Sequence, residues 1–161
     1  MKRTFLIAFA CLSIALVGCE SKGGGSSAPP PDQGSKEPLE GIDSDNNGVR
    51  DDIEKAILEF APDPEQEEQR SALRQIAKGF QASVLAGDSN DTQEALKAWE
   101  TLSKGLNCLS EKYPDGGERT ASILIETATT NTDERLFAYW RFNELLSGQI
   151  FEYNDDSNPC D

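Results

Sequence analysis

Histidine is absent from this chain of 161 residues. Histidine is the commonest general base near neutral pH and the commonest metal ligand, so the usual catalytic triads and zinc sites are excluded. No glycine-rich phosphate-binding loop is present either. Paired carboxylates can hydrolyse glycans, but the acidic residues of this chain stand in no motif that identifies such an enzyme. We therefore expect no enzymatic activity.

Basic residues are also scarce. The sequence has 15 lysines and arginines against 29 aspartates and glutamates, and its formal net charge is −14. A chain this acidic repels nucleic acid and anionic lipid surfaces. The charge therefore favours cations, basic proteins or neutral surfaces as partners, and it predicts no binding of nucleic acid. Solubility alone is an equally good explanation of the charge.

The sequence lacks an apolar run of the about 20 residues that a membrane-spanning helix needs. Its apolar stretch near the start, residues 4–17, follows two basic residues, which is typical of a secretory signal peptide. The stretch leads into residues 16–19, Leu-Val-Gly-Cys, which resemble the lipobox of bacterial lipoproteins. The resemblance implies that residues 1–18 are a signal peptide and that Cys19 carries lipid. A signal peptide cut elsewhere and an uncleaved anchor are the alternatives.

The lipobox resemblance also implies a location in the cell envelope. It implies several acyl chains on Cys19, and two or more chains hold a protein stably at a membrane. Residue 20 is a glutamate, whereas an aspartate there usually retains Gram-negative lipoproteins in the inner membrane. For a Gram-negative source we therefore expect the outer membrane, facing the periplasm. Residues 19–40 contain the lipidated cysteine and a flexible linker rich in glycine, serine and proline, and residues 41–161 form the folded domain.

The four cysteines have separate expected fates. Cys11 leaves with the signal peptide and Cys19 takes the lipid. Cys108 and Cys160 remain, and an even pair in an oxidising compartment favours a disulfide. The bond would attach the C-terminal tail to the helix that carries Cys108. Two free thiols are the alternative, and the spacing does not fit a zinc site.

One motif has a defined chemistry. Residues 43–54, Asp-Ser-Asp-Asn-Asn-Gly-Val-Arg-Asp-Asp-Ile-Glu, resemble an EF-hand calcium loop. In such a loop oxygen ligands alternate along the chain, and a glycine at the sixth position lets the chain turn around the ion. Gly48 stands at that position. The expected ligands are the side chains of Asp43, Asp45, Asn47, Asp51 and Glu54 and the backbone carbonyl of Val49.

This loop resembles those of EF-hand-like secreted proteins more than the paired loops of calmodulin. Residues 38–42 leave no room for a full helix before it, and no second loop occurs. Arg50 takes the eighth position, where paired loops place an apolar residue. A single loop outside the cytoplasm predicts structural Ca²⁺ rather than a sensor. The alternative is an Asx-rich turn whose acidic residues cap the following helix.

Beyond the loop, apolar residues recur at spacings of three and four. This pattern predicts an all-α fold, a small antiparallel helical bundle of four to five helices preceded by the EF-hand-like loop. The last helix is expected from about residue 133 to about residue 147. Residues 123–125, Ile-Leu-Ile, could instead form a strand. The expected helix breaks lie near Pro62, Gly87, residues 114–117 and residues 131–134.

The last expected helix is unusually rich in aromatic residues. An exposed aromatic patch flanked by arginines is typical of a partner-binding surface. The alternative is that these residues belong to the core of a helix buried on two faces. The possible partner-binding residues are Arg135, Tyr139, Trp140 and Phe142.

Residues 135–148, with the loop upstream, resemble a group of uncharacterised bacterial exported proteins. That group has no established activity, so the resemblance adds little beyond the fold. We expect a membrane-anchored, calcium-binding envelope lipoprotein that acts as an adaptor or assembly factor for another envelope protein. The alternative is an inhibitor or immunity-type lipoprotein whose acidity neutralises a basic toxin or hydrolase. A dense acidic patch away from the loop would favour the inhibitor.

Overall fold

The computed structural model describes residues 38–151 and 158–161. Within these residues the chain forms five α-helices and one short 3-10 helix, and no strand. The all-α fold class is confirmed, and Ile123 lies in a helix rather than in a strand. The helices are α1 (Asp51–Phe60), η1 (Pro64–Gln66), α2 (Glu67–Ser89), α3 (Thr92–Lys112), α4 (Glu118–Thr129) and α5 (Asp133–Leu145).

Several sequence predictions concern residues outside this description. The signal peptide, Cys19 and all but the end of the linker belong to residues 1–37. Among the helices that the structure does describe, none is long and apolar enough to cross a membrane.

The helix boundaries follow the local signals in the sequence. The side chain of Asp91 accepts hydrogen bonds from the backbone N–H groups of Gln93 and Glu94, at 2.7 and 3.2 Å, and so caps α3. Helix α2 continues two residues past Gly87 and ends at Ser89, and its C-cap residue Asn90 has a left-handed φ of 54°. Gly87 does not end the helix. Its lack of a side chain instead lets the backbone at Ala138 pack directly against α2.

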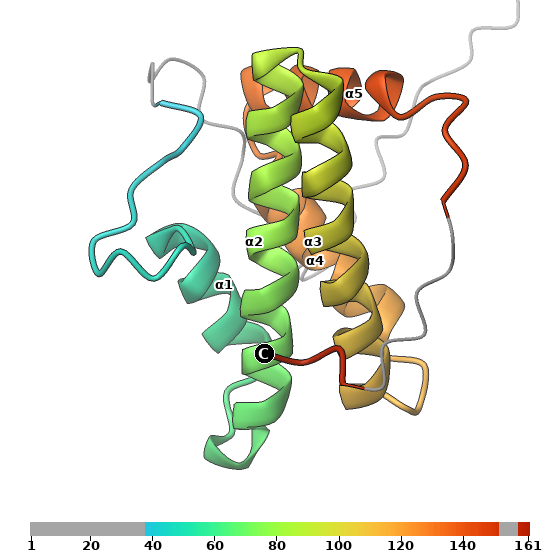
Figure 1. The fold of residues 1–161 in the computed structure, drawn as a ribbon. Coiled ribbons are helices and arrows are strands. Elements are labelled where there is room, and N and C mark those ends of the chain that lie inside the picture. Colours follow the sequence, from blue (N-terminus) through green and yellow to red (C-terminus); the bar gives the residue numbers. More distant parts are fainter. Residues whose placement is uncertain (1–37, 152–157) are drawn as a thin grey trace, which may run out of the picture. The chain divides into compact units, whose positions relative to one another are not determined.

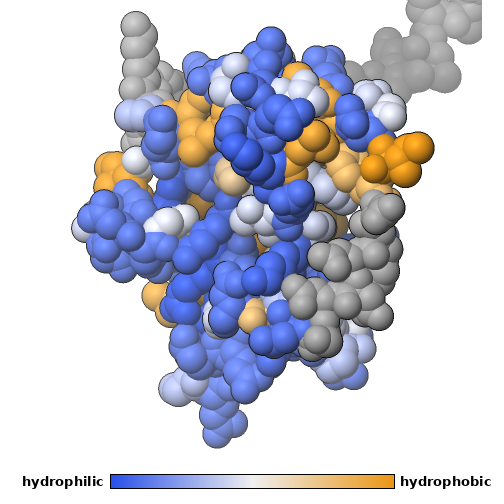
Figure 2. Space-filling view, in the orientation of Figure 1, coloured by the Kyte–Doolittle hydropathy of each residue, from blue (hydrophilic) through white to orange (hydrophobic). Residues whose placement is uncertain are grey.

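Helices α2 and α3 form an antiparallel hairpin at the centre of the described domain (Figure 1). Helix α2 packs against each of the other four α-helices. Helix α5 crosses the hairpin near its upper end in Figure 1. Hydrophilic residues cover most of the face shown in Figure 2, and the apolar residues visible there gather toward the end where α5 lies.

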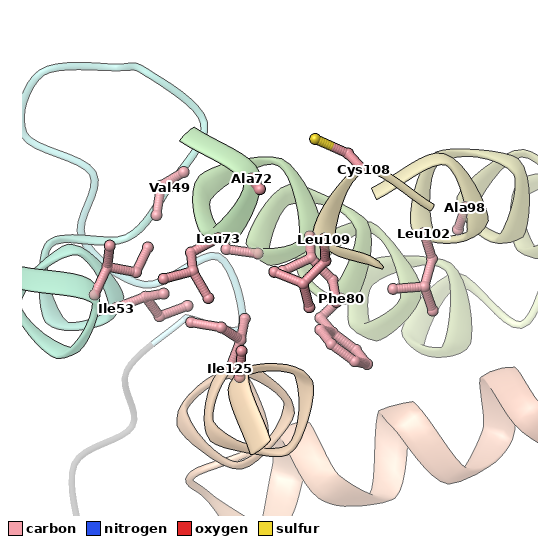
Figure 3. Close-up of a cluster of buried hydrophobic side chains, with 14 of the residues drawn as sticks. Val49, Ile53, Ala72, Leu73, Phe80, Ala98, Leu102, Cys108, Leu109 and Ile125 are labelled. Carbon is pink, nitrogen blue, oxygen red and sulfur yellow. The ribbon is translucent and has the colours of Figure 1, made fainter. Parts of the chain in front are cut away.

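The core joins the predicted calcium loop to the helices. Figure 3 shows Val49, Ile53, Leu73, Leu109 and Ile125 among side chains that converge from the loop and from α1 to α4. All five are at most 2% exposed. Burial of a side chain of this size contributes about 1.5–3 kcal/mol. Because Val49 is part of this core, the loop packs against the helices as part of the domain.

Glycines allow α2 to approach its neighbours very closely. A Cβ atom added to Gly79 would lie 2.6 Å from the Cα of Leu102, and one added to Gly105 would lie 2.9 Å from the Cα of Ile76. A Cβ atom on Gly87 would overlap the backbone carbonyl of Ala138 in α5. The backbones of α3 and α5 therefore touch α2 directly.

The predicted disulfide is confirmed. Cys108 and Cys160 are bonded across a sequence separation of 52 residues, with their Cα atoms 4.8 Å apart. In the chain-entropy model, such a cross-link stabilises the folded state by about 4 kcal/mol because it restricts the unfolded chain. The buried side chain of Gln75 also holds the tail, since it donates to the Pro159 carbonyl at 2.7 Å and accepts from the Asp161 N–H at 3.1 Å.

We predict that Gly79→Ala lowers the free energy of unfolding by about 1–3 kcal/mol, because the added methyl group overpacks the contact with α3. The better helix propensity of alanine works against this loss. Urea denaturation measures it. Ser71→Ala, at an exposed position of the same helix, is the control and should leave stability unchanged or raise it. Equal stability of the Gly79→Ala variant and the wild type would contradict the close approach.

Candidate functional site

The loop of residues 43–54 turns sharply and then runs directly into α1. Gly48 adopts a φ of 86°, a conformation that glycine reaches without strain. Helix α1 begins at Asp51, so Glu54 lies in its first turn. The buried Val49 fixes the middle of the loop to the core. The backbone thus has the sharp turn that the glycine predicted.

Three of the predicted ligands meet at a fourth, Asn47. The backbone N–H of Asn47 donates to Asp43 Oδ1 at 3.1 Å and to Asp45 Oδ1 at 3.2 Å. Its side-chain Nδ2 donates to Asp45 Oδ2 at 3.0 Å and to Glu54 Oε1 at 2.8 Å. The three carboxylates are therefore gathered around one residue by hydrogen bonds alone.

The other two predicted ligands are arranged differently. Asp51 accepts hydrogen bonds from the hydroxyl and the backbone N–H of Ser44, at 2.6 and 2.9 Å. These bonds, the hydroxyl bond first, hold the pKa of Asp51 below its ordinary value. Val49 donates its N–H to the side-chain oxygen of Asn47 at 2.8 Å. Within residues 38–151 and 158–161, no three acidic or cysteine side chains are arranged as a metal site.

The acidic residues of the loop do not cap the helix that follows. The N-cap residue of α1 is Arg50, and no side chain forms a capping hydrogen bond there. Asp43 instead accepts from the N–H of Gly48 at 2.8 Å, inside the loop. The simple capping interpretation therefore does not describe these residues. They satisfy the N–H groups of the turn itself.

Arg50 is the residue of this site that the sequence interpretation undervalued. Its side chain is 2% exposed. It forms a two-pronged ion pair with Asp52 at 2.6 and 2.9 Å. It also donates to the carbonyls of Ala128 and Thr129 at the end of α4, both at 3.1 Å. The charged arginine at the eighth loop position, where paired loops are apolar, was the available signal of this role.

Arg135 requires a correction, because it is buried and cannot form part of an exposed patch. It donates to Asn131 Oδ1 at 2.7 Å and to the backbone carbonyls of Pro38 and Leu39 at 3.1 and 3.3 Å. Arg50 donates to the same Asn131 oxygen at 3.2 Å. The two arginines thus connect the start of the domain, the loop, α4 and α5.

The two arginines lower the pKa of the Asp52 carboxylate. Its burial opposes ionisation, but the hydrogen bonds and charge of Arg50, with the charge of Arg135, outweigh burial and lower its pKa from the ordinary 3.8. A lowered pKa in the folded state stabilises the fold at higher pH. This contribution is complete above about pH 3.8 and is lost as the pH falls below that value toward the pKa of the folded state.

The aromatic residues of α5 divide between two faces. Phe142 is 1% exposed, so it belongs to the core and not to a partner-binding patch, as had been predicted for it. Tyr139 is half-buried against Phe80 and Phe142, and burial, followed by the charge of Glu126, raises its pKa to about 12. Trp140 is exposed, and so is Phe137 beside it.

No family of known proteins, no curated protein and no solved structure matches this chain.

We predict that Arg50→Lys lowers the free energy of unfolding by about 2–4 kcal/mol, because an ammonium group cannot replace the planar fork and leaves buried carbonyls of α4 without a donor. Chemical denaturation measures the loss. Arg119→Lys, at an exposed position of α4, is the matched control and should stay within about 0.5 kcal/mol of the wild type. Similar effects of the two substitutions would contradict the role of Arg50.

Proposed function

We propose that this protein is a lipid-anchored protein of the cell envelope whose helical domain binds structural calcium and serves as an adaptor or assembly factor for another envelope protein. Calcium binding is supported by the hydrogen bonds that bring the carboxylates of Asp43, Asp45 and Glu54 together around Asn47. Lipid on Cys19 would supply the membrane attachment, and the residues between Cys19 and Pro38 would act as the tether.

Calcium would replace hydrogen-bond donors that the loop now supplies from its own residues. The carboxylates of Asp43, Asp45 and Glu54 are the first candidates to hold the ion, with Asn47, Asp51 and the Val49 carbonyl completing the set. The nitrogen of the Asn47 amide faces two of these carboxylates, so its oxygen must turn toward the ion. Asp51 must also release Ser44. These two rearrangements favour weak binding, which suits a compartment rich in calcium.

The position of the loop supports a structural role for the ion. Val49 and Ile53 belong to the core, and Arg50 bonds the end of α4. An ion that stiffens the loop would therefore also hold α1 and α4 in place. A partner surface on the same domain would be more rigid as a result.

The distribution of acidic residues favours the adaptor over the inhibitor. The densest acidic run, residues 63–68, contains Glu67 and Glu68, which are already paired with cations of the same domain. Glu67 binds Arg70 and Arg74, at 2.8 and 2.9 Å, and Glu68 binds Lys112 at 3.0 Å. This run is therefore partly neutralised within the domain. The inhibitor remains the second candidate because of the net charge of −14.

Calcium binding predicts a stability increment that depends on Glu54. With a dissociation constant of about 1 mM, about 10 mM calcium stabilises the fold by about 1.4 kcal/mol, or about 5 °C in Tm. Glu54→Gln should abolish this increment. It also lowers Tm slightly in chelator, because the carboxylate faces Arg74 at 3.8 Å and accepts from Asn47.

Thermal unfolding in calcium and in chelator measures the increment. Glu65→Gln, at an exposed position of η1, is the control and should keep the full increment. The same increment in the wild type and the Glu54→Gln variant, or none in the wild type, would refute calcium binding at this loop.

Lipid attachment predicts a second, independent result. The full chain, expressed in bacteria with an alkyne-bearing fatty acid, should incorporate the label and sediment with membranes. Cys19→Ser should remove the label and release the protein, whereas Cys11→Ser should change neither property. Label that persists in the Cys19→Ser variant would overturn the proposed anchor.

A further inference from the structure

Two large aromatic side chains stand exposed on α5. Phe137 and Trp140 are 53% and 54% exposed, and their rings meet edge to face with their centres 5.4 Å apart. They are three residues apart and therefore neighbours on the helix surface. Aromatic pairs of this kind are enriched in the energetic centres of protein interfaces.

The helix below this pair is held firmly. Its opposite face carries the buried Ala138 and Phe142 and touches α2 at Gly87. Arg141 donates to the Gly87 carbonyl at 2.9 Å and pairs with Asp88 at 3.2 Å. The pair is thus presented on a rigid support, and the charge of the nearest arginine is partly neutralised by Asp88.

The border of the aromatic pair is acidic. Glu134 lies one turn before Phe137, and Glu144 lies one turn after Trp140. Both carboxylates are exposed, and neither forms an ion pair in the part of the chain that the structure describes. The surface therefore combines an apolar aromatic centre with two uncompensated negative charges at its ends.

We propose that Phe137, Trp140, Glu134 and Glu144 form a docking surface for a basic segment of another protein. An arginine or lysine of that segment would lie on the Trp140 ring as a cation–π pair and reach Glu144, while an apolar neighbour covers Phe137. A second copy of this chain would bring the same carboxylates and repel, and an anionic lipid surface would repel as well. This inference rests on the proposed adaptor function and names the chemistry of its partner.

Site-specific cross-linking in the native envelope tests the surface. A photo-reactive phenylalanine analogue replaces Phe137 in the full chain, and the cross-linked peptide is identified by mass spectrometry. We expect one partner protein whose cross-linked peptide has a net positive charge and contains arginine or lysine. The same analogue at Ile123, an equally exposed position of α4, should not yield that product.

Charge-reversal variants test whether the partner recognises this surface or only the net negative charge of the protein. Glu134→Lys combined with Glu144→Lys should lower the yield about tenfold. Glu100→Lys combined with Glu111→Lys changes the net charge equally at exposed positions of α3 and should leave the yield unchanged. Trp140→Ala should also lower the yield, and a retained Tm confirms that each variant folds.

Several outcomes would overturn the proposal. They are adducts to lipid, to a second copy of this chain or to an acidic peptide, and equal losses in the two charge-reversed variants. The experiment is run in calcium and in chelator. A cross-link that persists in both media supports the surface even if the calcium site fails, whereas a missing cross-link refutes the surface and leaves the calcium and lipid results standing.

Discussion

The contact of backbone with backbone along α2 determines most of this architecture. At Gly79 and Gly105 the hairpin of α2 and α3 closes without side chains between the two helices, and at Gly87 helix α5 lies directly on α2. Helices this close leave little volume between them, so many core positions hold alanine. The buried alanines include Ala72, Ala77, Ala95, Ala98, Ala121 and Ala138. The larger apolar side chains fill the space farther out, where α1 and α4 cover the hairpin.

The periphery is joined by buried arginines rather than by apolar packing alone. Arg50 and Arg135 share one oxygen of Asn131 and between them reach the loop, the end of α4 and the residues before Gly41. A paired EF-hand supports its loop against a second loop. Here the same support comes from the C-terminal carbonyls of α4. In the part of the chain that the structure describes, this loop is therefore held to the helices by Arg50 and needs no second loop for support.

The parts of the fold that depend on local chemistry could be predicted from the sequence. The spacing of apolar residues predicted the helices, and the even number of remaining cysteines predicted the disulfide. The division of α5 into two faces could not be predicted, because it depends on where Gly87 meets Ala138. The inward face of α5 carries Arg135, Ala138 and Phe142. Because one of these residues is charged and another is small, they do not form a recognisable apolar pattern in the sequence. Besides Asn131, the buried Arg135 needs the carbonyls of Leu39 and Pro38 as acceptors, which lie 96 and 97 positions away and which no sequence spacing reveals.

The packing around the disulfide also decides how the bond can be broken. Cys108 is almost fully buried, so a thiol cannot easily attack its sulfur. Attack on the sulfur of Cys160 would release the Cys108 thiolate into an apolar environment, where the charged form is disfavoured. Either route becomes easy only after the tail lifts away from Gln75 and Lys104. The rate at which a reductant cleaves this bond would therefore report how often the last residues of the chain leave the domain, while the helices beneath stay folded.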